Sequence, residues 1–151
     1  MKPQPDAEFA AFVGIDWADA KHDICLQVAH GEEREFAVLS HRADAIQAWA
    51  AALRQRFAGR PVAVSLELAK GPLVYALQKY DFLVLFPINP STLAKYREAF
   101  TPSHAKADPT DAELALELLI RYRGKLKAHP PQSVAMRMLL RLVEQRPPAR
   151  R

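Results

Sequence analysis

An apolar run that ends on an acid, Phe12-Val13-Gly14-Ile15-Asp16-Trp17, predicts a buried β-strand near the start of the chain. Two further apolar runs follow at residues 23–29 and 35–39, with a turn at residues 31–33 between them. Successive short strands joined by turns pair with their neighbours in antiparallel fashion. We therefore expect a three-stranded meander in this part of the fold.

The next part of the chain alternates helical and strand patterns. Apolar residues recur at spacings of three and four over residues 46–57, which predicts a helix that Ser40 or Asp44 could cap. A strand, a helix and a second strand are expected after it, at residues 62–66, 71–80 and 82–86. Strands that alternate with helices pair in parallel through crossover connections. The predicted fold class is thus α/β, a ribonuclease H-like mixed sheet in which a three-strand meander is followed by two parallel strands with crossover helices.

Further helical patterns fill the rest of the chain. Residues 90–100 and 108–122 predict two helices with a polar loop between them. A linker with two adjacent prolines follows at residues 125–132, and residues 133–145 predict a basic helix with one apolar side. The prolines at 147 and 148 would end that helix.

The composition is that of a single globular domain, with 151 residues of which 50% are hydrophobic and 25% charged. No apolar run approaches the roughly 18 residues that a membrane span requires, and the first residues lack the apolar block of a signal peptide. We therefore expect a cytoplasmic protein that makes no membrane contact. The lone Cys25 lies in an apolar run, which predicts a small core residue rather than a redox or zinc site.

The net charge of +4 is unevenly distributed along the chain. Residues 1–120 contain 12 Lys and Arg against 16 Asp and Glu, whereas residues 121–151 contain 9 Lys and Arg against one Glu. A basic segment on an acidic body indicates a polyanionic partner such as a nucleic acid, although a solvated basic helix would give the same count.

Four acids are candidate catalytic residues and metal ligands. Asp16 and Glu67 end two predicted strands, and Asp108 and Asp111 lie three apart, which would place both on one face of a helix. Ligands of open α/β sheets bind beyond the carboxyl ends of the strands. Carboxylate oxygens suit Mg²⁺ (or Mn²⁺), and two such ions can activate a nucleophile and stabilise the leaving oxygen at a phosphodiester.

Each acid also has a purely structural explanation. The tetrapeptide Asp108-Pro109-Thr110-Asp111 fits a helix start in which Asp108 is the N-cap. Asp16 could be an acid at the edge of a strand, and Glu67 could cap the turn that follows. The metal-site interpretation depends on all four acids meeting in space.

Candidate contacts to nucleic-acid phosphates are Lys21, His104, Lys106, Arg137, Arg141 and Arg146. His104 and Lys106 fall in the polar loop before Asp108, where they could contact phosphate or face water. The three arginines lie in the basic carboxy-terminal segment, where phosphate contacts would weaken steeply with salt. Three other histidines are interpreted as turn residues rather than ligands, namely His22, His30 and His41.

Three stretches of this sequence resemble the amino-terminal domain of the DEDD transposases of insertion-sequence family one hundred and ten, which are related to the Piv and MooV DNA invertases. They are residues 12–21, Glu67 with Gly71 beyond it, and Lys106-Ala107-Asp108-Pro109-Thr110-Asp111-Ala112. The resemblance implies a RuvC-like domain whose catalytic tetrad falls on Asp16, Glu67, Asp108 and Asp111. It also implies Mg²⁺-dependent DNA strand cleavage and exchange in transposition, a guide RNA in some members, and a homo-oligomer in full-length relatives.

The same resemblance suggests how the chain is organised. We expect a flexible N-terminus at residues 1–11, a RuvC-like catalytic domain at 12–124, and a linker with a truncated basic helix at 125–151, the start of a helical arm. Two departures stand out. Lys70 lies where relatives usually have an uncharged residue, and no second domain with the serine nucleophile of the family follows. A truncated fragment is therefore expected.

Three other functions remain open at this stage. A Holliday-junction-type nuclease would use the same four acids on branched DNA. A non-catalytic remnant would bind DNA or RNA through the basic segment. An ATPase of the actin and sugar-kinase type also opens with a similar strand, but its glycine-rich phosphate loop is hard to build from five glycines.

Overall fold

The first apolar run forms β1 (Ala11–Asp16), the central strand of a five-stranded sheet with the order β3-β2-β1-β4-β5. The computed structural model describes residues 8–18, 20–67, 71–100 and 110–123. β1 pairs antiparallel with β2 and parallel with β4, while β2 pairs antiparallel with β3 and β4 parallel with β5. The other strands are β2 (Lys21–Val28), β3 (Arg34–Ser40), β4 (Val62–Glu67) and β5 (Leu83–Ile88). This is the predicted meander followed by two parallel strands, so the ribonuclease H-like fold class is confirmed.

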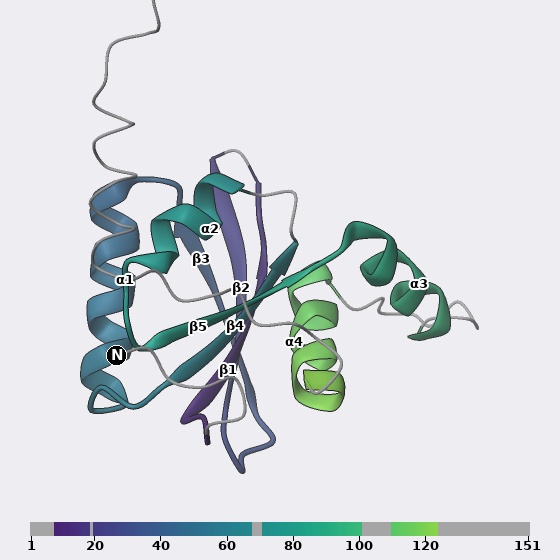
Figure 1. Ribbon diagram of the computed structural model, residues 1–151, viewed down its shortest axis with the longest axis horizontal. Coiled ribbons are helices and arrows are strands. Elements are labelled where there is room, and N and C mark those ends of the chain that lie inside the picture. Colours follow the sequence, from purple (N-terminus) through teal and green to yellow (C-terminus); the bar gives the residue numbers. More distant parts are fainter. Residues whose placement is uncertain (1–7, 19, 68–70, 101–109, 124–151) are drawn as a thin grey trace, which may run out of the picture.

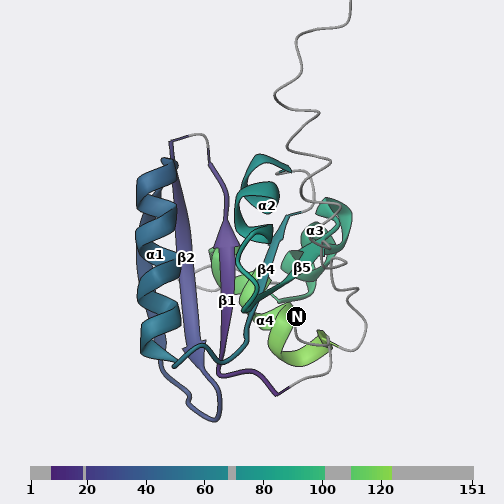
Figure 2. The ribbon, with the colours of Figure 1, turned by 60° about the vertical axis from the view of Figure 1, so that its left-hand side comes forward.

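Helices cover both faces of the sheet (Figure 1 and Figure 2). On one face, α1 (Ala43–Arg56) and α2 (Gly71–Gln78) pack on alternate residues of the strands and form the larger core with them. On the other face lies α4 (Asp111–Tyr122), with α3 (Pro90–Phe100) beside it. The alternation of side chains along each strand therefore divides the core into two layers.

Gly14 lets α4 approach the sheet closely. A Cβ atom at this position would lie 2.2 Å from the carbonyl oxygen of Ala112 and 2.6 Å from the amide nitrogen of Leu116. Both are backbone atoms of α4, so neither could move aside without moving the helix. The missing side chain of Gly14 therefore sets how near α4 lies to β1.

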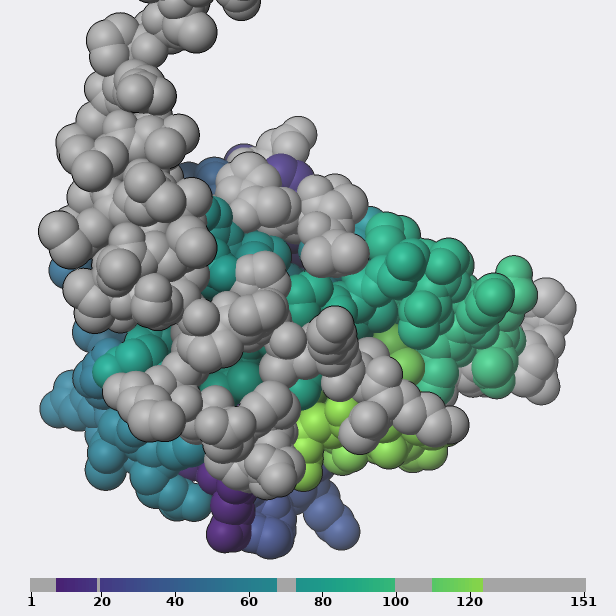
Figure 3. Space-filling view, viewed as in Figure 1, coloured from purple at the N-terminus to yellow at the C-terminus, as the bar shows by residue number. Residues whose placement is uncertain are grey.

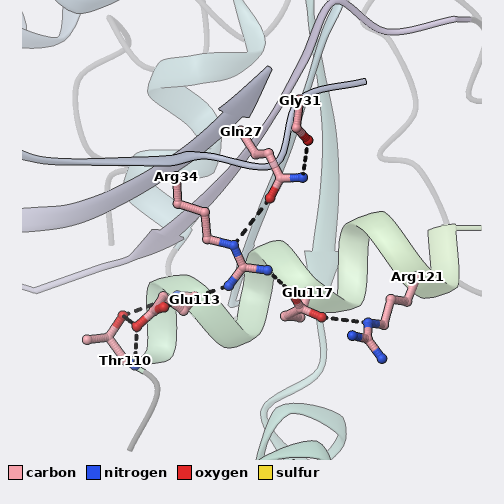
Figure 4. A network of polar contacts seen from close by, with 7 residues as sticks. All are labelled: Gln27, Gly31, Arg34, Thr110, Glu113, Glu117 and Arg121. Carbon is pink, nitrogen blue, oxygen red and sulfur yellow. Dashed lines mark hydrogen bonds and ion pairs between the residues drawn. The ribbon is translucent and has the colours of Figure 1, made fainter. Parts of the chain in front are cut away.

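A polar network fixes the edge of the sheet to α4 (Figure 4). The Arg34 side chain of β3 forms ion pairs with Glu113 and with the largely buried Glu117, and its Nε donates to Gln27 Oε1 at 3.2 Å. Glu117 also pairs with Arg121, at 2.6 Å, one turn along α4. Arg34 therefore connects the β2–β3 hairpin to α4, which packs over β1.

Two predicted helix starts are wrong in detail. α4 begins at Asp111 rather than Asp108, because Thr110 and Glu113 form a reciprocal capping box: the Glu113 amide donates to Thr110 Oγ1, and the Thr110 amide donates to Glu113 Oε1. α1 is preceded by Arg42, whose side chain makes no cap hydrogen bond, so neither Ser40 nor Asp44 is its N-cap.

In the part of the chain that the structure describes, no helix is both long and apolar enough to cross a membrane. Cys25 is fully buried against α4, as predicted for a core residue. Burial raises the pKa of its thiol to about 11, so the side chain stays protonated at neutral pH.

Candidate functional site

Asp16 and Glu67 are the last residues of two neighbouring parallel strands. The paired register of β1 with β4 ends at Ile15 and Leu66, one residue before each acid. Paired strands lie about 4.8 Å apart, and residues in register project from the same face of a sheet. Val13 and Ile15 project towards α1 and α2. Alternation therefore directs Asp16 and Glu67 to the opposite face, which α4 covers.

The direction of α4 brings a third acid to the same end of the sheet. Ser65 Oγ donates to the carbonyl oxygen of Ala115 at 2.7 Å, and Ala63 packs against Leu119, so the helix runs opposite to β4. Because the two elements run in opposite directions, the end of β4 at Glu67 lies at the same end of the sheet as the start of α4 at Asp111. The first turn of α4 thus lies at the carboxyl ends of β1 and β4.

The carboxylate of Asp111 already has a cationic partner. Arg97, in the last turn of α3, forms an ion pair with Asp111 Oδ1, and both side chains remain partly exposed. α3 and α4 share an apolar contact through Leu93, Leu114 and Leu118, and they lie side by side on the surface (Figure 3). The packing of α3 on α4 therefore holds a guanidinium at the candidate site.

The four predicted acids are only partly described. Asp16, Glu67 and Asp111 lie at one end of one face of the sheet, while Asp108 lies outside the described residues. Among the residues that the structure does describe, no group of three or more His, Cys, Asp or Glu side chains is gathered closely enough to hold a metal ion. The metal-binding tetrad therefore stays a prediction.

Sequence reasoning missed one acid beside this site. Asp23 of β2 is the register partner of Asp16, so it lies one strand further along the same face, and it is exposed. Its place depends on the register of the β1–β2 hairpin. The apolar run at residues 23–29 predicts a strand that begins at Asp23, whereas β2 begins two residues earlier, at Lys21.

Two of the histidines predicted to be turn residues, His22 and His41, form a cluster with Trp17 in which His22 is buried and the other two are half-buried. His22 is fully buried within β2 and stacks on Trp17, with ring centroids 5.5 Å apart. The Ala18 amide donates to His22 Nδ1 at 3.1 Å, so the ring proton of His22 is on Nε2 and is donated to His41 Nδ1 at 2.9 Å. Burial and the neighbouring His41 lower the pKa of His22. This chain of hydrogen bonds fixes the backbone just after Asp16.

Among the predicted nucleic-acid contacts, the structure describes Lys21 alone, which is exposed at the start of β2. The others lie outside the described residues: His104, Lys106, Arg137, Arg141 and Arg146. Lys70 also lies outside them. The predicted contacts to nucleic-acid phosphates therefore stay predictions.

Comparison with known proteins gives consistent results. The sequence profile of a family described as transposase, the DEDD transposases of the IS110 type, matches residues 13–148. The chain is 31% identical to "Putative transposase y4uE" of Sinorhizobium fredii over 111 residues, which are 72% of this chain and 31% of that protein. It is 31% identical to "Mini-circle putative transposase for IS117" of Streptomyces coelicolor over 122 residues, which are 80% of this chain and 28% of that protein. The matched part thus spans less than a third of the length of these curated relatives.

Proposed function

We propose that this chain, which belongs to the IS110-type DEDD transposase family, supplies the part of a transposase that cleaves and exchanges DNA strands with divalent metal ions. One observation carries the proposal. Asp16 and Glu67 end adjacent parallel strands, and Asp111 begins the helix that packs over the same face.

The donor set suits a hard divalent cation. Asp16, Glu67 and Asp111 offer only carboxylate oxygens, which Mg²⁺ and Mn²⁺ prefer over nitrogen or sulfur ligands. With Asp108, which precedes α4 in the sequence, they would hold the metal. When bound, the metal would activate the attacking hydroxyl or water and stabilise the leaving oxygen of the phosphodiester.

The chain itself would prepare this site in two ways. The pairing of β1 with β4 would hold the backbone of Asp16 and Glu67 at the spacing of neighbouring strands, which limits the reorganisation that cation binding requires. Arg97 neutralises Asp111 in the absence of a cation. Arg97 also places a guanidinium beside the site, where it would bind a phosphate oxygen of DNA.

DNA is the proposed partner, and the basic carboxy-terminal segment would add affinity. Lys21 lies on the strand next to β1, on the described part of the surface. Arg137, Arg141 and Arg146 would contribute phosphate contacts, and the binding constant would then fall as salt rises. A guide RNA would be held by the same phosphate-directed contacts.

The test is metal-dependent nicking of supercoiled plasmid DNA by the 151-residue chain. We expect nicking with Mg²⁺ or Mn²⁺ that EDTA abolishes and that Asp16→Asn reduces by about 100-fold or more, because one ligand of the reacting centre is lost. Asp81→Asn is the matched control: Asp81 lies before β5, at the opposite end of the sheet, and pairs with Arg54. This variant should cleave like the wild type.

Two results would contradict the proposal. Wild-type protein that binds DNA without nicking it under any of these metal conditions would favour the non-catalytic remnant. Equal nicking by wild type and Asp16→Asn would mean that the activity has another source. Preference for a four-way junction over linear duplex would instead support the Holliday-junction nuclease.

A further inference from the structure

The outer edge of β3 has the features of a pairing surface. β3 is the last strand of the sheet on its side, and β2 is its strand partner among the described residues. Phe36 is 61% exposed and Val38 is 62% exposed, and no charged residue or proline occurs from Phe36 to Ser40. Edge strands of monomeric proteins are commonly protected by charges, prolines or bulges. Residues 36–40 of β3 contain neither a charged residue nor a proline.

We propose that β3 pairs antiparallel with β3 of a second copy of this chain, around a two-fold axis at Ala37. The two sheets would then continue into one another across the axis. The proposal is independent of the proposed function, because no residue of the candidate metal site takes part in it.

The sequence of β3 is complementary to itself in this register. Phe36 faces Val38 of the other copy, and Val38 faces Phe36, so the four exposed apolar side chains contact one another on one face. Aromatic and β-branched residues form favourable cross-strand pairs. Shifting the strands by two residues in one direction instead pairs Val38 with Arg34, and in the other direction Phe36 with Ser40. The register centred on Ala37 is therefore the one in which every Phe36 and Val38 side chain faces another apolar side chain.

Charges at the two ends of the strand favour the same arrangement. The turn before β3 carries the exposed acids Glu32 and Glu33, and the exposed base Arg42, which pairs with Asp44 of its own chain, follows the end of β3. In the register centred on Ala37, Glu32 of one copy faces Arg42 of the other. Antiparallel pairing brings the acidic end of one copy to the basic end of the other. This charge complementarity makes a second copy the occupant that fits the edge.

The oligomeric state of the full chain tests this proposal. Sedimentation equilibrium should find a dimer for the wild type, and Phe36→Lys with Val38→Lys should raise its dissociation constant about tenfold or more. Tyr75→Lys is the matched control, because Tyr75 is an exposed aromatic residue on α2, away from β3. A monomeric wild type, as expected if another part of the chain covers this edge, would overturn the proposal. So would a double variant that dimerises like the wild type.

Cysteine cross-linking tests the register without removing the apolar residues. Ala37 is exposed and faces its own copy at the axis, where Cα atoms lie about 4.5–5.5 Å apart, within reach of a disulfide. Ala37→Cys should therefore form a covalent dimer on mild oxidation. Ser40→Cys is the control, because the two Ser40 residues would lie about 20 Å apart. Equal cross-linking of the two variants, or none in Ala37→Cys, would contradict the proposed pairing.

Discussion

Gly14 shows how a single residue sets the geometry of the site. Its missing side chain lets the backbone of α4 lie against β1 near Ala112 and Leu116. The same close contact determines where the first turn of α4, with Asp111, stands relative to Asp16. Packing at this one position therefore links the core to the candidate site.

We predict that Gly14→Ala lowers the free energy of unfolding by about 1–3 kcal/mol, because the added methyl group overpacks the contact with the helix backbone. Gly31→Ala is the control with the smaller expected cost, since a Cβ there makes a tight contact of 3.2 Å with the carbonyl oxygen of Val28 but does not overlap it. Urea unfolding of both variants measures the difference. An equal cost at the two glycines would show that α4 does not depend on Gly14.

His22 makes the stability dependent on pH. Burial and the nearby His41 lower its pKa below the ordinary value of 6.5, so the folded protein binds this proton less readily than the unfolded chain. The stabilisation is then complete above about pH 6.5 and is lost as the pH falls towards the lower folded pKa. Denaturant unfolding between roughly pH 5 and 8 should show this fall.

His22→Phe should flatten that pH dependence, because the buried titrating group is gone. His30→Asn removes an exposed histidine and should leave the slope as in the wild type. If His22→Phe keeps the full wild-type slope, the buried His22 is not its origin.

At the residue scale, the sequence was informative where an acid ends an apolar run. Asp16 and Glu67 were located in this way, and the strand bounds agree. His22 and Asp23 were missed, because their burial and neighbours depend on the hairpin register, which pairs Asp16 with Asp23. The residue types at the start of β2 do not by themselves show which residues of β1 they pair with.

At the scale of elements, Arg34 connects β3 to α4 through a carboxylate that is largely buried. The Glu117 side chain is 8% exposed and pairs with both Arg34 and Arg121. Removing one partner leaves a buried charge incompletely compensated, which is costly in a medium of low polarity. The network therefore restrains the helix that carries Asp111.

We predict that Arg34→Met lowers the free energy of unfolding by about 3 kcal/mol. Adding Glu117→Gln should restore part of that loss, and the coupling between the two changes should be about 1–3 kcal/mol. Arg54→Met removes an exposed ion pair with Asp81 and should cost less than about 1 kcal/mol. Additive effects of Arg34→Met and Glu117→Gln would contradict the described network.

The helix starts show a second limit of prediction from sequence. Thr110 and Glu113 already have the spacing of a capping box, but Asp108-Pro109 offered a competing N-cap signal. Local patterns of this kind locate a helix well and its first residue poorly. The apolar face of α4 was predictable, whereas the layer of the sheet that it covers was not.

At the scale of the whole molecule, the order of strands and helices predicted the sheet topology. The carboxyl ends of the parallel strands β1, β4 and β5 lie at one end of the sheet, and the first turn of α4 lies at the same end. The fold thereby places Asp16, Glu67 and Asp111, which are far apart in the sequence, at one end of the sheet. The exposed edge of β3 was not evident from the sequence, because exposure depends on how far α4 extends across the sheet.

Binding of Mn²⁺ by the full chain tests the central claim most directly, because the claim is that the acids at the carboxyl ends of β1 and β4 form a cation site. Isothermal titration calorimetry should detect binding by the wild type, with an affinity about tenfold or more lower in Asp16→Asn and in Glu67→Gln, because each loses a ligand. Asp81→Asn should bind like the wild type. Equal affinity in all four proteins, or no binding by the wild type, would contradict the account.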